Sequence, residues 1–233
     1  MNLKGYIYHD QGALFGAPDI IGFGSDEWHV KEIDRQIANE VIVKNHYSNK
    51  FYNATYIHLG VFIDGEMLGV LQYGYAMNPA SCGSVVEGTK MDEYLELNRM
   101  WLDDKAPRNS ESMAISYSFK YIKGRYPKIK WVQSFADERC GGFGIVYQAC
   151  SFDYYGEHSS VFWTLDGEVF HNIIKTSDRA GSTGYQKLNS EYGLKNAKKD
   201  SLRQFRYIKF IDKRWKKKCL LEEKPYLKHY NGD

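Results

Sequence analysis

A strand, a glycine-rich loop and a short helix follow one another between residues 131 and 156, and this succession constrains the fold more than any other part of the chain. The run from Trp131 to Phe135 predicts a buried strand, and Asp137 opens the turn that follows it. The helix after the loop carries Tyr147 and leads into another strand. In α/β folds, a strand end beside a helix N-terminus is a common position for binding and catalysis. The stretch therefore predicts an α/β fold with a functional site here.

The clearest local pattern lies between Thr55 and Ala76. Two runs rich in β-branched and aromatic residues flank the pair Asp64-Gly65, which favours a two-residue turn between antiparallel strands. Hydrophobic period and cap residues predict further strands at 28–33, 94–102, 153–165, 168–174 and 204–211, and helices at 34–45, 110–123 and 186–192. Asp34 caps the first helix, whose inner face we expect to contain Ile37, Ala38 and Val41, with Val43 or Lys44 at its edge.

This order of elements indicates a single α/β domain with a mixed, largely antiparallel central sheet flanked by helices. We expect the domain to cover residues 28–211. Residues 1–27 are rich in glycine and are expected to be irregular, and residues 212–233 form a basic C-terminal extension.

The composition is that of a globular cytoplasmic protein. Hydrophobic residues make up 43% of the 233 residues, which is enough for a core. No run approaches the roughly 20 apolar residues of a membrane span, and the first residues lack the basic-then-apolar order of a signal peptide. The cysteines occur singly, without the paired spacing of zinc sites, at Cys82, Cys140, Cys150 and Cys219.

Positive charge is concentrated near the C-terminus, although the whole chain carries only +2. Between Lys195 and Lys218, eleven lysines and arginines stand against two aspartates, which gives this segment +9 and leaves −7 for the rest. Aromatic residues alternate with the basic ones, which suits phosphate contacts and stacking on bases; the alternative is a final strand followed by a solvated lysine run. We predict DNA contacts from Arg206, Lys213, Arg214, Lys216, Lys217 and Lys218.

Four longer runs carry a resemblance to a known family. They are HYS at 46–48, LELNRMWLDDKAPRNSES at 95–112, WVQSFADERCGGFGIVYQA at 131–149 and FWTLDGE at 162–168. Together they resemble the phage Mom family, which modifies adenine in DNA and has a GNAT-like acyltransferase fold. The resemblance extends over about residues 28–211 and is more specific than any three-residue motif.

The resemblance implies transfer of a carbamoylmethyl group to N6 of adenine in double-stranded DNA, in the host cell cytoplasm, which protects phage DNA from restriction. It also implies a set of active-site residues: Tyr47, Arg99, Ser112, Asp137 and Tyr147. His46 is a further candidate beside them and a candidate metal ligand, with iron as the metal.

A GNAT-like fold also implies where a cofactor pyrophosphate binds, namely between a long strand and the next helix, here Asp103 to Ser112. The residues there that would contact it are Arg108, Asn109, Ser110 and Ser112. Glycines that let backbone N–H groups approach phosphate are absent, and Glu111 would repel it. The R-x-x-G-x-G pattern at 139–144 lies one strand too late. Two donors stay open: acetyl-coenzyme A, and an activated glycine such as glycyl-tRNA, which would make tRNA a second partner.

Each candidate residue also has a structural interpretation. Asp137 is either a base-recognition residue or general base, or the N-cap of the next helix. Arg99 either orients an anionic group or forms a buried ion pair, and the two tyrosines are either active-site or core residues. Two other functions stay open as well: a GNAT N-acetyltransferase that acts on a protein or small-molecule amine, and a non-catalytic DNA-binding protein.

Overall fold

The computed structural model describes residues 5–9, 19–138, 141–176 and 182–228. The chain forms two compact units. The first unit contains Met1–Ser134, Ile145–Tyr155 and Tyr207–Tyr226, and the second contains Phe135–Gly144, Gly156–Arg206 and Leu227–Asp233. The single catalytic domain over residues 28–211 and the extension at 212–233 stay predictions.

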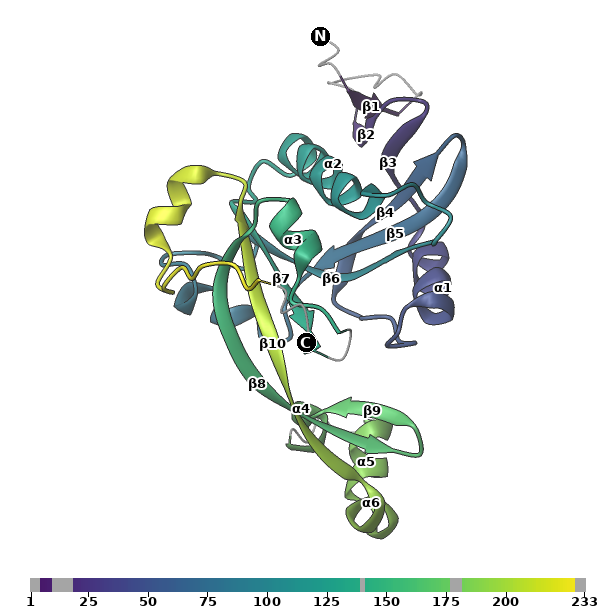
Figure 1. Ribbon diagram of the computed structural model, residues 1–233, viewed down its shortest axis with the longest axis vertical. Coiled ribbons are helices and arrows are strands. Elements are labelled where there is room, and N and C mark those ends of the chain that lie inside the picture. Colours follow the sequence, from purple (N-terminus) through teal and green to yellow (C-terminus); the bar gives the residue numbers. More distant parts are fainter. Residues whose placement is uncertain (1–4, 10–18, 139–140, 177–181, 229–233) are drawn as a thin grey trace. The chain divides into compact units, whose positions relative to one another are not determined.

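The strands form a mixed sheet in the order β1-β2-β3-β4-β5-β6-β7-β10-β8-β9 (Figure 1). Strands β1 to β6 pair antiparallel with their neighbours, and β6 and β7 run parallel. The expected mixed, largely antiparallel sheet is thus confirmed. The strands are β1 (Tyr6–Tyr8), β2 (Ile20–Gly24), β3 (Trp28–Glu32), β4 (Thr55–Ile63), β5 (Glu66–Gly74), β6 (Tyr94–Leu102), β7 (Trp131–Asp137), β8 (Asp153–Leu165), β9 (Glu168–His171) and β10 (Lys198–Phe210).

Helices cover both faces of the sheet in the first unit. On β5, Gln72 bonds to Asn39 of α1, whereas the next residue, Tyr73, bonds to Ser118 of α2. Because consecutive strand residues point to opposite faces, α1 and α2 lie on opposite sides. The helices are α1 (Arg35–Asn45), η1 (Pro79–Ser84), α2 (Ser110–Arg125), α3 (Ile145–Ala149), α4 (Asn172–Thr176), α5 (Thr183–Asn189), α6 (Glu191–Asn196) and η3 (Lys213–Lys218).

Helix α1 begins as expected but buries a different face. Asp34 caps it by accepting a hydrogen bond from the Gln36 backbone N–H at 2.6 Å. Ala38 and Ile42 are buried, whereas Ile37 is 46% exposed and Val43 and Lys44 also face solvent. The prediction was therefore wrong for Ile37, Val43 and Lys44. Ile42 lies one turn after Ala38, and both side chains pack against Val70 of β5.

The β4–β5 hairpin turns at Asp64 and Gly65, as predicted. Both have positive φ, 49° and 82°, as a type I′ turn requires. Asp166 and Gly167 repeat this geometry between β8 and β9, with φ of 52° and 77°. Two Asp-Gly pairs therefore fix the register of two hairpins.

The N-terminal segment is more regular than predicted. Residues 1–27, expected to be irregular, contain β1 and β2, which pair antiparallel and continue the sheet from β3. Gly124 of α2 packs closely against this segment, since a Cβ on it would lie 2.4 Å from the Tyr6 ring. The Tyr6 hydroxyl also donates to the Lys120 carbonyl at 3.1 Å.

The C-terminal third departs from prediction in three boundaries. The strand expected over 168–174 ends at His171, and α4 follows it. The single helix expected over 186–192 is two helices, α5 and α6, separated by Ser190, which caps the second. The last strand begins at Lys198 rather than Gln204.

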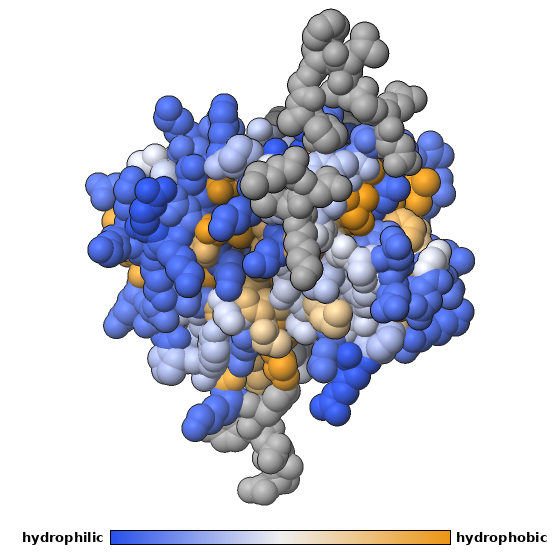
Figure 2. Space-filling view, turned by 90° about the horizontal axis from the view of Figure 1, so that it is seen from above, coloured by the Kyte–Doolittle hydropathy of each residue, from blue (hydrophilic) through white to orange (hydrophobic). Residues whose placement is uncertain are grey.

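No helix in the described part of the chain combines the length and apolar character that spanning a membrane requires. In Figure 2 hydrophilic residues cover most of the visible face, and apolar residues form small patches between them.

Candidate active site

The parallel strands β6 and β7 separate in the first unit. Their pairing, which begins at Tyr94 and Trp131, ends at Glu96 and Gln133. At the next residue of β7, a side-chain hydrogen bond replaces the backbone pairing: the Ser134 hydroxyl donates to the Leu97 carbonyl at 3.1 Å. The interruption of a parallel pair leaves room for side chains or a ligand between strand ends, which is where open α/β sheets usually bind ligands.

Tyr147 of α3 faces this point. Its Oη lies 2.9 Å from the Ser134 Oγ. Its ring packs edge-on against Phe152, with ring centres 5.3 Å apart, and is tilted against Tyr207, with ring centres 5.4 Å apart. Because the Ser134 hydroxyl has one proton and donates it to Leu97, Tyr147 acts as donor in the contact between the two hydroxyl groups.

Ser112 is linked to Tyr147 through Cys150. The Cys150 thiol donates to the Ser112 carbonyl at 3.4 Å, and the Cys150 backbone N–H donates to the Tyr147 carbonyl at 3.1 Å. Burial raises the pKa of the Cys150 thiol to about 11. The thiol therefore stays protonated at neutral pH and connects the start of α2 to α3.

Arg99 of β6 holds the loop that follows α1. Its Nε donates to the Lys50 carbonyl at 3.2 Å and its Nη1 to the Asn98 carbonyl at 2.7 Å. Its guanidinium carbon lies 5.9 Å from the centre of the Tyr52 ring. Arg99 thereby brings the loop containing His46 and Tyr47 to the sheet face that α1 covers.

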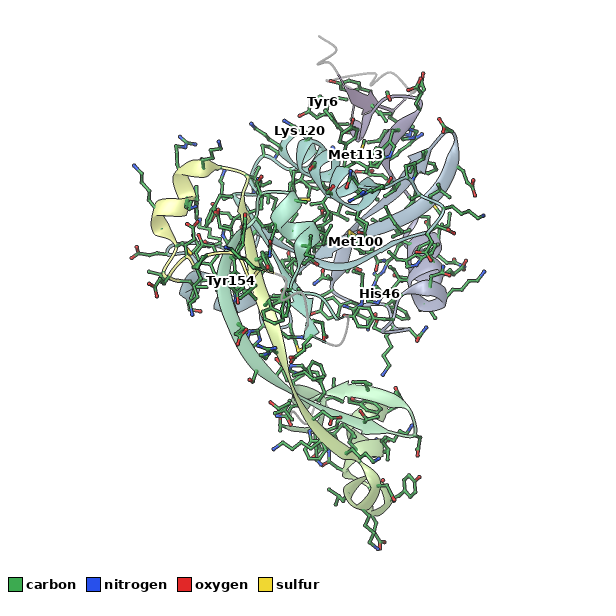
Figure 3. The ribbon with its side chains drawn as sticks, viewed as in Figure 1. Tyr6, His46, Met100, Met113, Lys120 and Tyr154 are labelled. Carbon is green, nitrogen blue, oxygen red and sulfur yellow. The ribbon has the colours of Figure 1, made fainter. Side chains whose placement is uncertain are left out.

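His46 lies at the end of α1 (Figure 3), and its ring is next to that of Tyr47. Their ring centres are 4.2 Å apart, with His46 buried and Tyr47 53% exposed. The His46 Nδ1 lies 2.8 Å from the Ser48 Oγ and 3.2 Å from the Ser48 backbone nitrogen, so Ser48 holds this side of the ring and Nε2 is the nitrogen left for a ligand. Among the described residues, no group of three or more His, Cys, Asp or Glu side chains has an arrangement that could hold a metal ion.

Asp137 belongs to the second unit, where it is the last residue of β7 and only 6% exposed. Helix α3 begins only at Ile145, but Glu138, directly after Asp137, already has the backbone of a 3-10 helix, so the N-cap alternative for Asp137 stays a prediction. The following residue, Glu138, accepts three hydrogen bonds from Arg203 at 2.8 to 3.0 Å. These bonds lower the pKa of Glu138 and fix the chain directly after Asp137.

The N-terminus of α2 is the predicted position for a cofactor pyrophosphate. Its cap residue, Asn109, is left-handed with φ of 70° and makes no side-chain capping bond. Ser110 is 3% exposed, and its Oγ has no hydrogen-bond partner within the described part of the chain. Ser112 donates to the Asn109 carbonyl at 2.9 Å, and Arg108 is exposed. Backbone N–H groups in the first turn of a 16-residue helix attract negative charge, although Glu111 opposes it.

The competing glycine loop is only partly described, since Arg139 and Cys140 lie outside the described residues. Gly141 and Gly144 have positive φ, 67° and 82°, which explains these glycines by backbone geometry.

The basic residues near the C-terminus are ordered. Trp215, Cys219 and Leu221 pack against the core of the first unit, so η3 is attached to the body. Lys216 forms ion pairs with Asp153 at 3.0 Å and Glu223 at 2.7 Å, and Arg214 pairs with Asp212 at 2.7 Å. The exposed side chains of η3 are Lys213, Arg214, Lys216, Lys217 and Lys218. Arg206, in the second unit, lies over the Phe135 ring at 5.1 Å.

The structure thus groups the predicted residues in three places. Tyr47, His46 and Arg99 share one loop and sheet face, Ser112 and Tyr147 are linked across α2 and α3, and Asp137 lies in the second unit. Sequence reasoning did not select three polar side chains where β6 and β7 separate, namely Glu96, Asn98 and Gln133. Polar residues within otherwise apolar strands are the signal that marks them.

A family model and a related protein both match this chain over most of its length. The chain matches the family model "Mom protein family" over residues 27–228. It is 48% identical over 214 residues to "Methylcarbamoylase mom" of Escherichia phage Mu, covering 90% of this chain and 87% of that protein.

Solved acetyltransferase structures are more distant. RimL, a ribosomal L7/L12 alpha-N-protein acetyltransferase, is 14% identical with a TM-score of 0.45, over 80% of this chain and 95% of that one. The ribosomal-protein-S5-alanine acetyltransferase from Vibrio fischeri is 11% identical with a TM-score of 0.47, over 84% of this chain and 98% of that one.

Proposed function

This chain belongs to the Mom protein family, and from that premise we propose that it is a phage DNA-modification enzyme. It transfers a carbamoylmethyl group to N6 of adenine in double-stranded DNA, in the host cell cytoplasm, and so protects that DNA from restriction. The observation that carries the proposal is the 48% identity to a methylcarbamoylase over 90% of the chain. The family match, over residues 27–228, includes every candidate site residue.

The acceptor amine sets the chemical problem. The N6 lone pair of adenine is delocalised into the ring, and in a duplex the amine is paired with thymine. The enzyme has to extrude the base, hold it and remove a proton from N6 as the new bond forms. Asp137, a buried carboxylate at a strand end, is proposed to recognise the base or accept that proton.

The first unit supplies the other roles. Tyr147 is proposed as the general acid for the leaving group, because its hydroxyl is oriented by Ser134 at the separation of β6 and β7. Tyr47 is exposed beside His46 and suits stacking on a base or on the donor. Arg99 and Ser112 are proposed to orient the donor, Arg99 through its guanidinium and Ser112 from the start of α2.

The start of α2 is proposed to contact phosphate of the donor through Arg108, Asn109, Ser110 and Ser112. Its support is the uncapped helix end and the partnerless Ser110 hydroxyl. An acyl-coenzyme A donor and glycyl-tRNA both carry phosphate. Glycyl and carbamoylmethyl groups on N6 are isomers, so transfer of glycine followed by rearrangement gives the same product mass.

Purified protein, DNA and a labelled donor separate these options. Label from glycyl-tRNA in adenine supports activated glycine, and label only from acetyl-coenzyme A supports the coenzyme. The described residues offer no cluster of three or more His, Cys, Asp or Glu side chains that could hold iron.

Contacts with DNA phosphates are proposed for the exposed basic side chains of η3 and for Arg206. Lys213, Lys217 and Lys218 suit this role best, since Arg214 and Lys216 already have carboxylate partners. Electrostatic binding of this kind weakens steeply with salt.

The alternative function is an N-acetyltransferase that uses acetyl-coenzyme A on a protein or small-molecule amine. The uncapped N-terminus of α2 favours it, because a coenzyme pyrophosphate would suit that position. Calorimetry with coenzyme A tests it, and tight binding without DNA modification would favour this alternative.

The main test is mass spectrometry of nucleosides from the DNA of cells that express the protein. We expect a carbamoylmethyl-type adenosine with the natural chain and none with Asp137→Ala. Asp92→Ala, which removes an exposed carboxylate of a surface ion pair, serves as the control. Unmodified DNA with the natural chain would reject the proposal.

A further inference from the structure

Three polar side chains of the first unit meet where the pairing of β6 and β7 ends. The Glu96 carboxylate accepts hydrogen bonds from both neighbours: from the Asn98 Nδ2 at 3.0 Å and from the Gln133 Nε2 at 2.8 Å. The Asn98 Nδ2 also donates to the Tyr75 carbonyl at 3.1 Å. The two amide groups are therefore held by their NH₂ ends.

The two amide oxygens are left without partners. The Asn98 Oδ1 and the Gln133 Oε1 are buried and accept no hydrogen bond from the described part of the chain. Turning either amide over would place its oxygen against the Glu96 carboxylate, so the orientation is fixed by chemistry. A buried acceptor without a partner is costly, and two in one cluster call for an occupant that donates hydrogen bonds.

The position of the cluster suits a ligand. Beyond Glu96 and Gln133 the described residues continue no β6–β7 backbone pairing, and the Ser134 side chain bridges the two strands instead. Glu96 and Asn98 are partly exposed, so the cluster reaches solvent, whereas Gln133 is 5% exposed. Gln133 precedes Ser134, which contacts Tyr147, so the cluster and the candidate acid flank the same point from opposite faces.

We propose that Asn98, Gln133 and Glu96 form a subsite for a primary amine. The two amide oxygens accept the amine hydrogens, and the carboxylate supplies the negative charge that favours a positive or partly positive nitrogen. This inference rests on the proposed function, in which two reactants carry such a group. One is the N6 amine of adenine, and the other is the amino group of an activated glycine.

Paired ligands distinguish these sources. The first pair is deoxyadenosine and purine deoxyriboside, which lacks the 6-amino group. The second is glycine methyl ester and its N-acetyl derivative, which lacks the basic amine. Titrations of the full chain are followed by the side-chain amide NMR signals of Asn98 and Gln133. We expect the amine-bearing member of one pair to shift both signals and to bind about tenfold more tightly, as loss of one or two hydrogen bonds implies.

Gln133→Met keeps the size of the side chain and removes the acceptor, so it should abolish that preference. Gln36→Met is the matched control, since the Gln36 amide likewise donates to a glutamate, Glu40, but on the surface of α1. The inference is overturned if the natural chain prefers the amine in neither pair, a result that depends on no variant. It is also overturned if Gln133→Met keeps the preference.

DNA modification is read separately. An amine preference without any modified adenine in cells would leave this subsite standing and reject the proposed function. If a folded Gln133→Met variant modified adenine at the natural level, the proposed function would stand and the subsite would be rejected.

Discussion

Replacement of Tyr147 by phenylalanine tests the general-acid role most directly. The change removes one oxygen and keeps the ring contacts with Phe152 and Tyr207. The lost contact is the 2.9 Å hydrogen bond to Ser134, whose own proton still has the Leu97 carbonyl as acceptor. We therefore expect the free energy of unfolding to fall by about 1 kcal/mol, the usual net value of one hydrogen bond.

A loss of that size leaves almost all of the protein folded, since domains typically have about 5–15 kcal/mol of stability. Transfer should fall much further, by about 10²- to 10⁴-fold, which corresponds to roughly 3 to 5 kcal/mol of transition-state stabilisation from a general acid. The assay is the fraction of modified adenine in cellular DNA at early times, divided by the amount of folded protein.

Tyr207→Phe is the matched control. The ring centres of Tyr207 and Tyr147 are 5.4 Å apart, and the Tyr207 hydroxyl accepts a hydrogen bond from the Gln148 Nε2 at 3.1 Å. Its loss should cost a similar amount of stability without a role in transfer. If Tyr147→Phe modifies DNA within about threefold of Tyr207→Phe, general-acid catalysis by Tyr147, worth about 10²-fold or more, is refuted.

Four further results are expected. Changing Lys213, Lys217 and Lys218 together to glutamine should lower the slope of log affinity for DNA against log salt by about 2 to 3, and an unchanged slope in filter binding would reject these phosphate contacts. Arg214 holds the pKa of Asp212 at about 2, below its ordinary 3.8, so the stabilisation from this carboxylate is complete above pH 4 and lost as pH falls towards 2. In acid titrations followed by circular dichroism, Asp212→Asn should therefore be less stable than the natural chain at pH 7 and equal to it near pH 2. Cys150, whose pKa is raised to about 11, should react with iodoacetamide at pH 8 only after unfolding, as peptide mass spectrometry would record. Asp34→Ala should lower the free energy of unfolding by about 1 kcal/mol in urea titrations, because α1 loses its cap.

Local chemistry made much of the fold predictable. The Asp64-Gly65 pair identifies its hairpin because few residues tolerate positive φ, and strand β6 is found at its predicted bounds, Tyr94 to Leu102. Elements whose ends depend on distant contacts were less predictable. The side chain of Asn172 accepts a hydrogen bond from Trp163 at 2.8 Å, at the point where β9 gives way to α4.

In the candidate site, too, some residues could be predicted from local sequence and others could not. Asp137 and Tyr147 could be predicted as site residues, because Asp137 ends strand β7 and Tyr147 lies in the short helix α3 that follows it. Glu96 and Gln133 meet only through the register of two parallel strands whose sequence positions are far apart. No local pattern contains that register, and neither the 2.8 Å contact nor the partnerless oxygens follow from composition.

The pairing of β1 and β2 onto β3 has a practical consequence for work with this protein. The family match begins at residue 27, which invites expression of a shortened chain from that point. Such a chain would leave β3 as a bare sheet edge, with unpaired backbone groups along Trp28 to Glu32 ready to pair with another molecule. It would also uncover Gly124, where Tyr6 now packs. Truncation at the family boundary should therefore yield aggregates, and an affinity tag is better attached ahead of the complete N-terminal segment.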